Sequence, residues 1–226
     1  MNDPKPLVVF DMDGVLVRER SSWRLVHDAL GTSNEDSFSA YMRGDIDDME
    51  FMRRDISLWL QRGVTTLSSV GDILRRATLM NGFEQCMTEL RRSGAVLGMI
   101  SGGLDLLANR LGEEGGFTHV SANGLSVDIH GNLTGEGILR VPLMDKGSIL
   151  KRLKGGKPDY DPVIAVGDSR VDIPMFQLSD LGIAFRPEYE DVAGSADVEV
   201  SDPDLMAIPE IVVEFFDRGR PFGKFQ

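Results

Sequence analysis

The sequence contains one cysteine, Cys86, among 226 residues, so an internal disulfide is excluded. Positive charge is also scarce, because 24 Lys and Arg residues stand against 36 Asp and Glu residues and give a formal net charge of -12. Nucleic acids and anionic membranes attract basic surfaces, so this balance argues against both as partners. An anionic small molecule can still bind where local positive charge opposes the surrounding field.

Long apolar runs are missing as well. No uninterrupted apolar segment approaches the ~18 residues of a membrane span. The first residues of the chain lack the basic start and apolar stretch of an export signal. The histidines His27, His119 and His130 share no metal-ligand spacing. We therefore expect a cytoplasmic protein that is bound neither to membranes nor to nucleic acid, and the oligomeric state stays open.

The chain does contain a series of short apolar runs separated by helical patterns. Strands that alternate with helices are typical of a parallel sheet built from right-handed crossovers. A chain of this length can bury such a core and carry an insertion. We therefore predict an α/β fold with a parallel sheet. The expected strands are Leu7–Phe10, Ala95–Ile100, Thr118–Ala122, Val163–Val166 and Leu181–Ala184.

The interval from about residue 18 to residue 80 differs from the rest because its pattern is helical without strands. We predict a small helical lobe over 18–80 that is inserted after the first strand, with 1–17 and 81–226 forming the core. Short polar side chains stand where helices of this lobe would begin. The expected helix caps are Asn34, Asp47 or Asp48, and Ser69 with Asp72.

Two later segments also have a readable pattern. The segment Leu125–Arg140 places His130-Gly131-Asn132 between alternating stretches, which predicts a β-hairpin. Asp202-Pro203 is a typical helix start, and the apolar spacing that follows predicts a helix that closes the fold.

Carboxylates gather where two of the predicted strands end. Asp11 and Asp13, with one residue between them, follow the first apolar run, and Asp168 and Asp172 follow a later one. Ligands bind at this edge of open α/β sheets. Four carboxylates close together are tolerable only with a cation between them or with strongly raised pKa values. Hard oxygen ligands favour Mg²⁺, which we predict as the cofactor.

Groups suited to an anion accompany these carboxylates. Ser101-Gly102-Gly103 follows another predicted strand and offers a hydroxyl with open backbone N–H groups, and Lys146 adds a fixed positive charge. The combined set fits transfer of a phosphoryl group. In that chemistry one aspartate attacks phosphorus and forms an acyl-phosphate, while the other moves protons for the leaving alkoxide and for water.

In their order along the chain, these motifs resemble the signature of haloacid dehalogenase superfamily phosphatases, and within that superfamily phosphoserine phosphatases. The resemblance covers most of the chain and implies a Rossmann-like core with a helical cap inserted after the first strand. It implies that Asp11 is the nucleophile and Asp13 the acid/base, with Ser101 and Lys146 completing the catalytic set. It further implies that Mg²⁺ is bound by Asp11, the Asp13 carbonyl and Asp168, with Asp172 in support. The motifs are Asp-Met-Asp-Gly-Val-Leu-Val at 11 to 17, Ser-Gly-Gly at 101 to 103, Lys146, and Gly-Asp-Ser-Arg-Val-Asp at 167 to 172.

Three positions depart from the phosphoserine phosphatase pattern. Arg20 stands where the family has a glutamate for the substrate amine, and Glu19 lies one residue early. Asp55 falls where the family has an arginine for the substrate carboxylate, with Arg54 adjacent, and Val171 replaces an asparagine. Charged substrate groups left without partners would be costly. We therefore name Glu19, Arg20 and Arg54 as candidate substrate-binding residues and expect a substrate other than L-phosphoserine.

Three functions remain compatible with these residues. The first is a Mg²⁺-dependent phosphomonoesterase that acts on a small phosphorylated metabolite. The second is a phosphotransferase or phosphomutase that uses the same site, which would need a cap that excludes water. The third is a non-catalytic ligand-binding protein that keeps the fold. Since Asp11, Asp13, Lys146 and Asp168 are all present, the enzyme is favoured, and hydrolysis is its default reaction.

Overall fold

One seven-stranded sheet organises the computed structural model, which describes residues 4–156 and 159–217. The strands lie in the order β4-β3-β2-β1-β5-β6-β7. Neighbouring strands are parallel except for the antiparallel β3–β4 pair. The predicted α/β fold is therefore confirmed. The strands are β1 (Lys5–Phe10), β2 (Val96–Leu104), β3 (His119–Val127), β4 (Leu133–Ile138), β5 (Tyr160–Gly167), β6 (Leu181–Phe185) and β7 (Val198–Val200).

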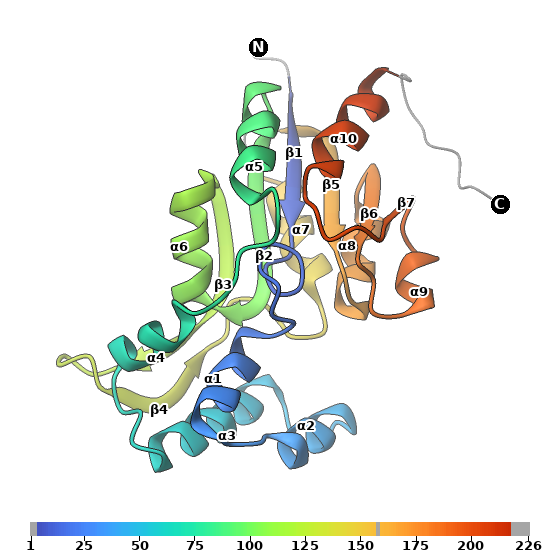
Figure 1. Cartoon of the computed structure of the whole chain (residues 1–226). Coiled ribbons are helices and arrows are strands. Elements are labelled where there is room, and N and C mark those ends of the chain that lie inside the picture. The colour runs from blue at the N-terminus through green and yellow to red at the C-terminus, as the bar shows by residue number, and fades with distance from the viewer. Residues whose placement is uncertain (1–3, 157–158, 218–226) are drawn as a thin grey trace.

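Helices cover both faces of this sheet, and four of them lie beyond the end toward which β1 points (Figure 1). Those four, α1 to α4, follow β1 in the chain and are called the cap helices below. Across the described ranges, every helix is too short or too polar to cross a membrane. The helices are α1 (Ser22–Leu30), α2 (Glu35–Met42), α3 (Asp48–Gln61), α4 (Leu67–Leu74), α5 (Phe83–Arg92), α6 (Asp105–Gly115), α7 (Lys146–Lys154), α8 (Ile173–Leu178), α9 (Glu190–Ala193), α10 (Ala207–Asp217) and the 3₁₀ turn η1 (Arg170–Asp172).

The apolar residues of β1 are buried on both sides of the sheet. Val8 and Phe10 belong to the core that contains helices α5, α6 and α10, whereas Leu7 and Val9 belong to the core that contains α7 and α8. All four side chains are fully buried. A strand covered on both faces has no polar side to alternate with, which explains its continuous apolar run. The run ends where Asp11 reaches the carboxyl edge of the sheet.

Two neighbouring segments connect the core to the cap helices. The backbone N–H of Arg18 donates to the Thr78 carbonyl at 2.8 Å, and that of Met80 donates to the Leu16 carbonyl at 2.9 Å. The Glu19 carboxylate accepts the Thr78 N–H at 2.9 and 3.1 Å. The chain therefore leaves and re-enters the core through one hydrogen-bonded double linker, which fixes where the cap helices sit.

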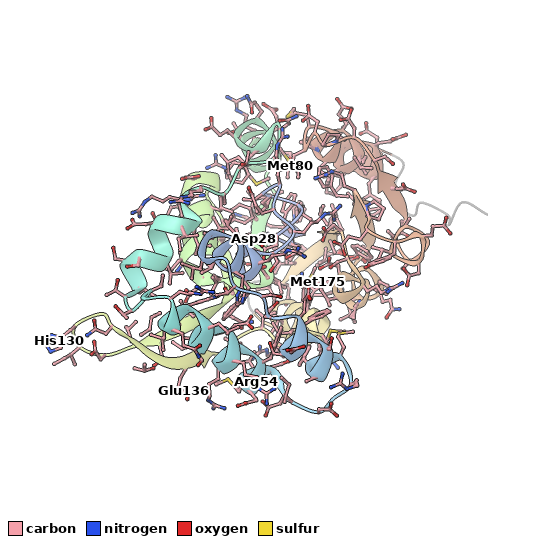
Figure 2. All side chains as sticks on the ribbon, turned by 60° about the horizontal axis from the view of Figure 1, so that its bottom comes forward. Asp28, Arg54, Met80, His130, Glu136 and Met175 are labelled. Carbon is pink, nitrogen blue, oxygen red and sulfur yellow. The ribbon has the colours of Figure 1, made fainter. Side chains whose placement is uncertain are left out.

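The predicted hairpin is present and gives the cap helices a second attachment. Strand β4 packs against α3, where Gly137 faces Met52 and Glu136 binds the Arg53 guanidinium at 2.9 and 3.0 Å. The backbone N–H of Leu67 donates to the Gly131 carbonyl near the hairpin tip at 3.1 Å. Figure 2 shows His130 at this projecting tip. Residues from the core part of the chain thus support the helices inserted after β1.

Two helix starts differ from the sequence-based expectation. Helix α4 begins at Leu67, because the Thr66 hydroxyl caps it by accepting the Ser69 N–H at 3.2 Å, so Ser69 lies inside the first turn. The closing helix α10 begins at Ala207, several residues after Asp202-Pro203. The intervening Leu205 is fully buried and its N–H donates to the Asn81 carbonyl at 2.9 Å, which holds this segment in a non-helical path.

The contact between the hairpin and α3 can be tested by adding one methyl group. In Gly137→Ala the new Cβ would lie 2.4 Å from Met52 Cε and 3.0 Å from Met52 Cβ, so we expect overpacking to cost about 1–3 kcal/mol of unfolding free energy. Gly71→Ala, at a half-buried position of α4 where the new Cβ would lie 3.9 Å from its nearest neighbour, is the matched control and should stabilise by about 0.5–1 kcal/mol. Urea denaturation measures both. Equal stabilities would contradict the described packing.

Candidate active site

A cavity of about 540 Å³ lies between the carboxyl edge of the sheet and the cap helices. Asp11, Ser101 and Asp168 line its sheet side, where Asp11 and Asp168 directly follow β1 and β5 and Ser101 lies in the last part of β2. Tyr41 of α2 and Asp55 of α3 line its cap side. The structure thus brings the motifs singled out in the sequence to one place, at the edge where open α/β sheets bind ligands.

Lys146 lies at the centre of the sheet side. Its ammonium Nζ is 2.7 Å from Asp11 Oδ2 and 2.7 Å from Asp172 Oδ1, and all three side chains are nearly fully buried. The residue opens helix α7, which Asp145 caps by accepting the Ser148 N–H at 3.0 Å. Burial alone would lower the Lys146 pKa, but the two carboxylates hold that pKa above its usual range. Lys146 is therefore a permanent buried cation.

Asp172 uses its second oxygen to shape the loop after β5. Oδ2 accepts the backbone N–H groups of Asp168 and Ser169 at 3.0 Å each, and the Ser169 hydroxyl at 2.9 Å. With Oδ1 bound to Lys146, both oxygens of this carboxylate are engaged within the protein. Asp172 is fully buried behind the cavity, whereas Asp168 lines it. Asp172 therefore orients Lys146 and the Asp168 loop.

The carboxylates Asp11, Asp168 and Asp172 can each offer an oxygen such that the three atoms lie within 4.8 Å of one another. Burial raises the pKa of Asp11 to about 7, although Lys146 opposes the rise. Burial and repulsion from Asp11 and Asp172 raise the pKa of Asp168 to about 8. The ionised forms of these clustered carboxyl groups repel one another. A hard divalent cation between them would relieve this repulsion. The donor set therefore suits a divalent metal.

Asp13 is held by the first residue of the cap helices. Its Oδ2 accepts both the N–H and the hydroxyl of Ser22 at 2.9 Å, and Ser22 Oγ in turn accepts the Leu104 N–H at 3.0 Å. Within the described part of the chain, Asp13 Oδ1 has no hydrogen-bond partner although it is buried. Burial raises the pKa of Asp13 to about 6, against the hydrogen bonds from Ser22. One oxygen is thus fixed and the other is free to exchange a proton.

The last residues of β2 are positioned by contacts from three sides. The Ser101 Oγ accepts the Gly103 N–H at 3.1 Å, so its own hydrogen can point to a ligand. The Gly102 carbonyl accepts the indole N–H of Trp23 and the amide of Asn123, each at 3.2 Å. A Cβ on Gly103 would lie 2.5 Å from Asp13 Oδ2, so only glycine allows this approach. These contacts fix the end of β2 so that Ser101 is presented to an anion.

Of the three predicted substrate-binding residues, one lines the cavity and two do not. Arg20 lines the cavity, where its guanidinium hydrogen-bonds the Asp168 carboxylate and donates to the Arg186 carbonyl at 3.1 Å. Glu19 lies in the double linker, outside the cavity lining. Arg54 is also outside the lining, paired with Glu50 at 2.9 Å, and Figure 2 shows it at the outer edge of the cap helices.

Several side chains that build the site were not predicted as site residues. Ser22 positions Asp13, and Asn123 holds both the Gly102 carbonyl and the backbone of the segment that leads to α7. Ser22 carried a detectable signal, since Ser21-Ser22 is a typical helix start directly after the first motif. Asn123 carried none, because an asparagine within a strand has no spacing that marks it.

The fold and the site define a Rossmann-like α/β protein with an acidic site between its sheet and an inserted group of helices. The family described as haloacid dehalogenase-like hydrolase matches residues 8–177. The phosphoserine phosphatase of Streptococcus thermophilus is 30% identical over 224 residues, which cover 95% of this chain and 99% of the relative. That of Methanocaldococcus jannaschii is also 30% identical, over 92% of this chain and 98% of the relative. The chain belongs to the haloacid dehalogenase-like hydrolase family.

Solved structures agree with this assignment. A phospho-aspartyl intermediate analogue of phosphoserine phosphatase superposes with a TM-score of 0.76 at 27% identity, over 92% of this chain and 99% of that chain. A substrate-bound phosphoserine phosphatase complex gives a TM-score of 0.76 at 27% identity, over 93% and 99%. The expected resemblance to phosphoserine phosphatases, which are phosphoric monoester hydrolases, is confirmed.

The raised carboxyl pKa values predict a pH-dependent effect of metal. Asp11, Asp13 and Asp168 bind protons more tightly in the folded than in the unfolded chain, so the stability that they contribute is complete below about pH 4 and is lost as the pH rises to about 8. We expect the melting temperature of EDTA-treated protein to fall over this range, and Mg²⁺ to raise it more at pH 8 than at pH 5.

Asp168→Asn provides the control for this experiment. Other carboxylates of an acidic chain also repel one another as the pH rises, so the part of the slope that Asp168→Asn removes is the part assigned to Asp168 and its coupling to the site. The variant should show a shallower fall in melting temperature and a smaller response to Mg²⁺. A metal effect of equal size at both pH values, or an unchanged slope in the variant, would contradict the site described.

Proposed function

We propose that this protein is a Mg²⁺-dependent phosphomonoester hydrolase that acts on a small phosphorylated metabolite through an aspartyl-phosphate intermediate. One observation carries the proposal. A buried carboxylate, Asp11, which Lys146 contacts at 2.7 Å, lines the same cavity as Asp13, whose Oδ1 is unpartnered within the described residues. A nucleophile and a proton-transfer group therefore line one cavity.

In the first step, an Asp11 carboxylate oxygen forms a bond to phosphorus while the bond from phosphorus to the substrate oxygen breaks. The Asp11 Oδ1 atom accepts the Met12 N–H at 2.7 Å, and Oδ2 faces Lys146, so the carboxyl plane is fixed before substrate binds. Lys146, the Ser101 hydroxyl and the nearby backbone N–H groups stabilise the charge on the phosphoryl oxygens.

Asp13 moves the protons of both steps. Its free Oδ1 gives a proton to the departing alkoxide, and later takes one from the water that attacks phosphorus and restores Asp11. Because Ser22 fixes Oδ2 with two hydrogen bonds, only Oδ1 is available for this exchange. The two aspartates thus divide nucleophilic and acid/base work between them.

The proposal includes a divalent cation because the site contains suitable ligands for one. The carboxylates of Asp11 and Asp168 and the backbone carbonyl of Asp13 would hold it, with Asp172 orienting Asp168 through the loop N–H groups. When bound, Mg²⁺ would neutralise these carboxylates and the phosphate that approaches them. The relatives named phosphoserine phosphatase, and the phospho-aspartyl analogue solved for one such enzyme, support both the reaction and the intermediate.

Removal of the Asp11 nucleophile tests the reaction itself. We expect wild-type protein to release phosphate from p-nitrophenyl phosphate with Mg²⁺ and to lose this activity with EDTA. Asp11→Asn should reduce kcat by at least about 10³-fold, because an amide does not form the acyl-phosphate. Asp36→Asn, an exposed residue of α2 outside the cavity lining, should keep the wild-type rate. Wild-type activity in Asp11→Asn would refute the mechanism.

The role of Asp13 predicts a dependence on the leaving group. Nitrophenolate departs without a proton, whereas an alkoxide requires one, so Asp13→Asn should slow the first step for an alkyl phosphate by about 10²–10⁴-fold and for p-nitrophenyl phosphate much less. Single-turnover experiments that trap the acyl-phosphate measure this step separately from its hydrolysis. Equal losses for both substrates would show that Asp13 does not act as the acid.

A further inference from the structure

The cap side of the cavity contains a carboxylate that the proposed chemistry does not use. Asp55 of α3 lines the cavity and is 2% exposed. Its Oδ2 accepts the Asn34 side-chain amide at 2.9 Å, whereas Oδ1 has no hydrogen-bond partner among the described residues. A buried acceptor left unmatched costs about 1–3 kcal/mol. Oδ1 is therefore a place where a bound molecule can supply a missing donor.

The neighbours of Asp55 hold it in a fixed orientation. The indole N–H of Trp59 donates to His27 Nδ1 at 3.3 Å, and the Thr32 hydroxyl lies 2.8 Å from the same nitrogen, so the imidazole hydrogen is assigned to Nε2. That Nε2 lies 3.2 Å from Asp55 Oδ2 but is not aligned for a hydrogen bond. Asp55 therefore stands beside two N–H donors, those of His27 and Asn34. The surroundings offer donors and an acceptor together.

Aromatic side chains form a second part of the same wall. Tyr41 stacks on Phe51 with ring centroids 5.1 Å apart and an interplanar angle of 11°, and Phe38 lies beside Phe51 at 6.2 Å. All three line the cavity, and Phe38 remains 51% exposed despite its size. Flat apolar surface of this kind binds the carbon–hydrogen face of a ligand.

The positive charges that line the cavity are committed elsewhere. In the described part of the chain they are Arg20, which pairs with Asp168, Lys146, which pairs with Asp11, and Arg24, which lies 3.8 Å from Asp28 and whose side chain is 79% exposed to solvent. A second anionic group near Asp55 would therefore be buried beside a carboxylate without a buried cation of its own, which is unfavourable. The part of the substrate that reaches Asp55 should not be negative.

We propose that the substrate is the phosphate ester of an uncharged, polyhydroxylated body such as a sugar or polyol, an inference that rests on the proposed phosphatase function. Its hydroxyl groups bind Asp55 and Asn34, and its carbon face lies against Phe38 and Tyr41. Hydroxyls both donate and accept, which matches the open acceptor of Asp55 and the side-chain amide of Asn34, both of which line the cavity, whereas an ammonium offers donors alone. Asp55 is then a specificity-determining residue.

A substrate panel tests this proposal. It compares kcat/KM for glucose 6-phosphate, fructose 6-phosphate, sorbitol 6-phosphate and ribose 5-phosphate with that for O-phospho-L-serine and O-phosphoethanolamine. Acetyl phosphate, whose body is small and lacks hydroxyls, reports phosphoryl transfer alone. We expect the best polyhydroxylated ester to exceed both amino compounds by at least about tenfold. Preference for an amino compound, or no preference at all, would overturn the proposal.

Variants assign the preference to the cap side. Asp55→Asn should lower the ratio of kcat/KM for the best sugar or polyol phosphate to that for acetyl phosphate by about 10–100-fold, as expected for a lost hydrogen bond to a charged group. Asp36→Asn, the exposed control on the same group of helices, should leave this ratio unchanged. An unchanged ratio in Asp55→Asn would overturn the proposal.

A second variant guards against misfolding of Asp55→Asn, whose melting temperature is measured first. Phe38→Ala removes a half-exposed ring, and it should lower the same ratio several-fold through a higher KM. If Asp55→Asn does not fold, an unchanged ratio in Phe38→Ala overturns the proposal. If wild-type protein with Mg²⁺ fails to hydrolyse acetyl phosphate or any ester, the phosphatase function itself fails, which separates the two conclusions.

Discussion

The contact of the Lys146 ammonium with Asp11 and Asp172 is the interaction on which the rest of the site depends. It joins the end of β1, the start of α7 and the turn after β5 at one point, with both distances at 2.7 Å. Each partner is buried, so loss of Lys146 would leave two buried carboxylates without their shared cation. The sheet brings three strand ends together, and this pair of contacts sets the distances between the groups they carry.

A second chain of contacts ties the cap helices to that centre. Ser22, the first residue of α1, donates to Asp13 and accepts the Leu104 N–H, so one hydroxyl bridges two strand ends of the core. The hairpin holds α3 from the opposite side through Glu136 and Gly137. Since α1 is fixed by the site and α3 by the hairpin, the cap residues that line the cavity have defined positions relative to Asp11 (Figure 1).

The sequence predicted what depends on local pattern and missed what depends on tertiary contact. The strands were predictable because burial on both faces gives continuous apolar runs, and the chemical motifs because they follow those runs directly. The predicted starts of α4 and α10 were wrong, because hydrogen bonds made by Thr66 and by the buried Leu205 determine where these helices begin. Arg54 was a candidate substrate-binding residue because it adjoins Asp55. On a helix, however, adjacent side chains point about 100° apart, and Arg54 pairs with Glu50 outside the cavity.

The groups proposed for catalysis and those proposed for substrate specificity lie on different elements of this molecule. The groups proposed for phosphoryl transfer stand at strand ends, where a shift of one side chain would disturb the buried ion contacts of Lys146. Asp55 lies in α3, and it contacts His27 of α1 and Asn34 in the turn before α2. Substitutions in that second network can alter which organic body fits while the reacting groups keep their positions. The cavity of this chain, which is about 30% identical to phosphoserine phosphatases, therefore has an acidic cluster on its sheet side and a carboxylate with an aromatic wall on its cap side.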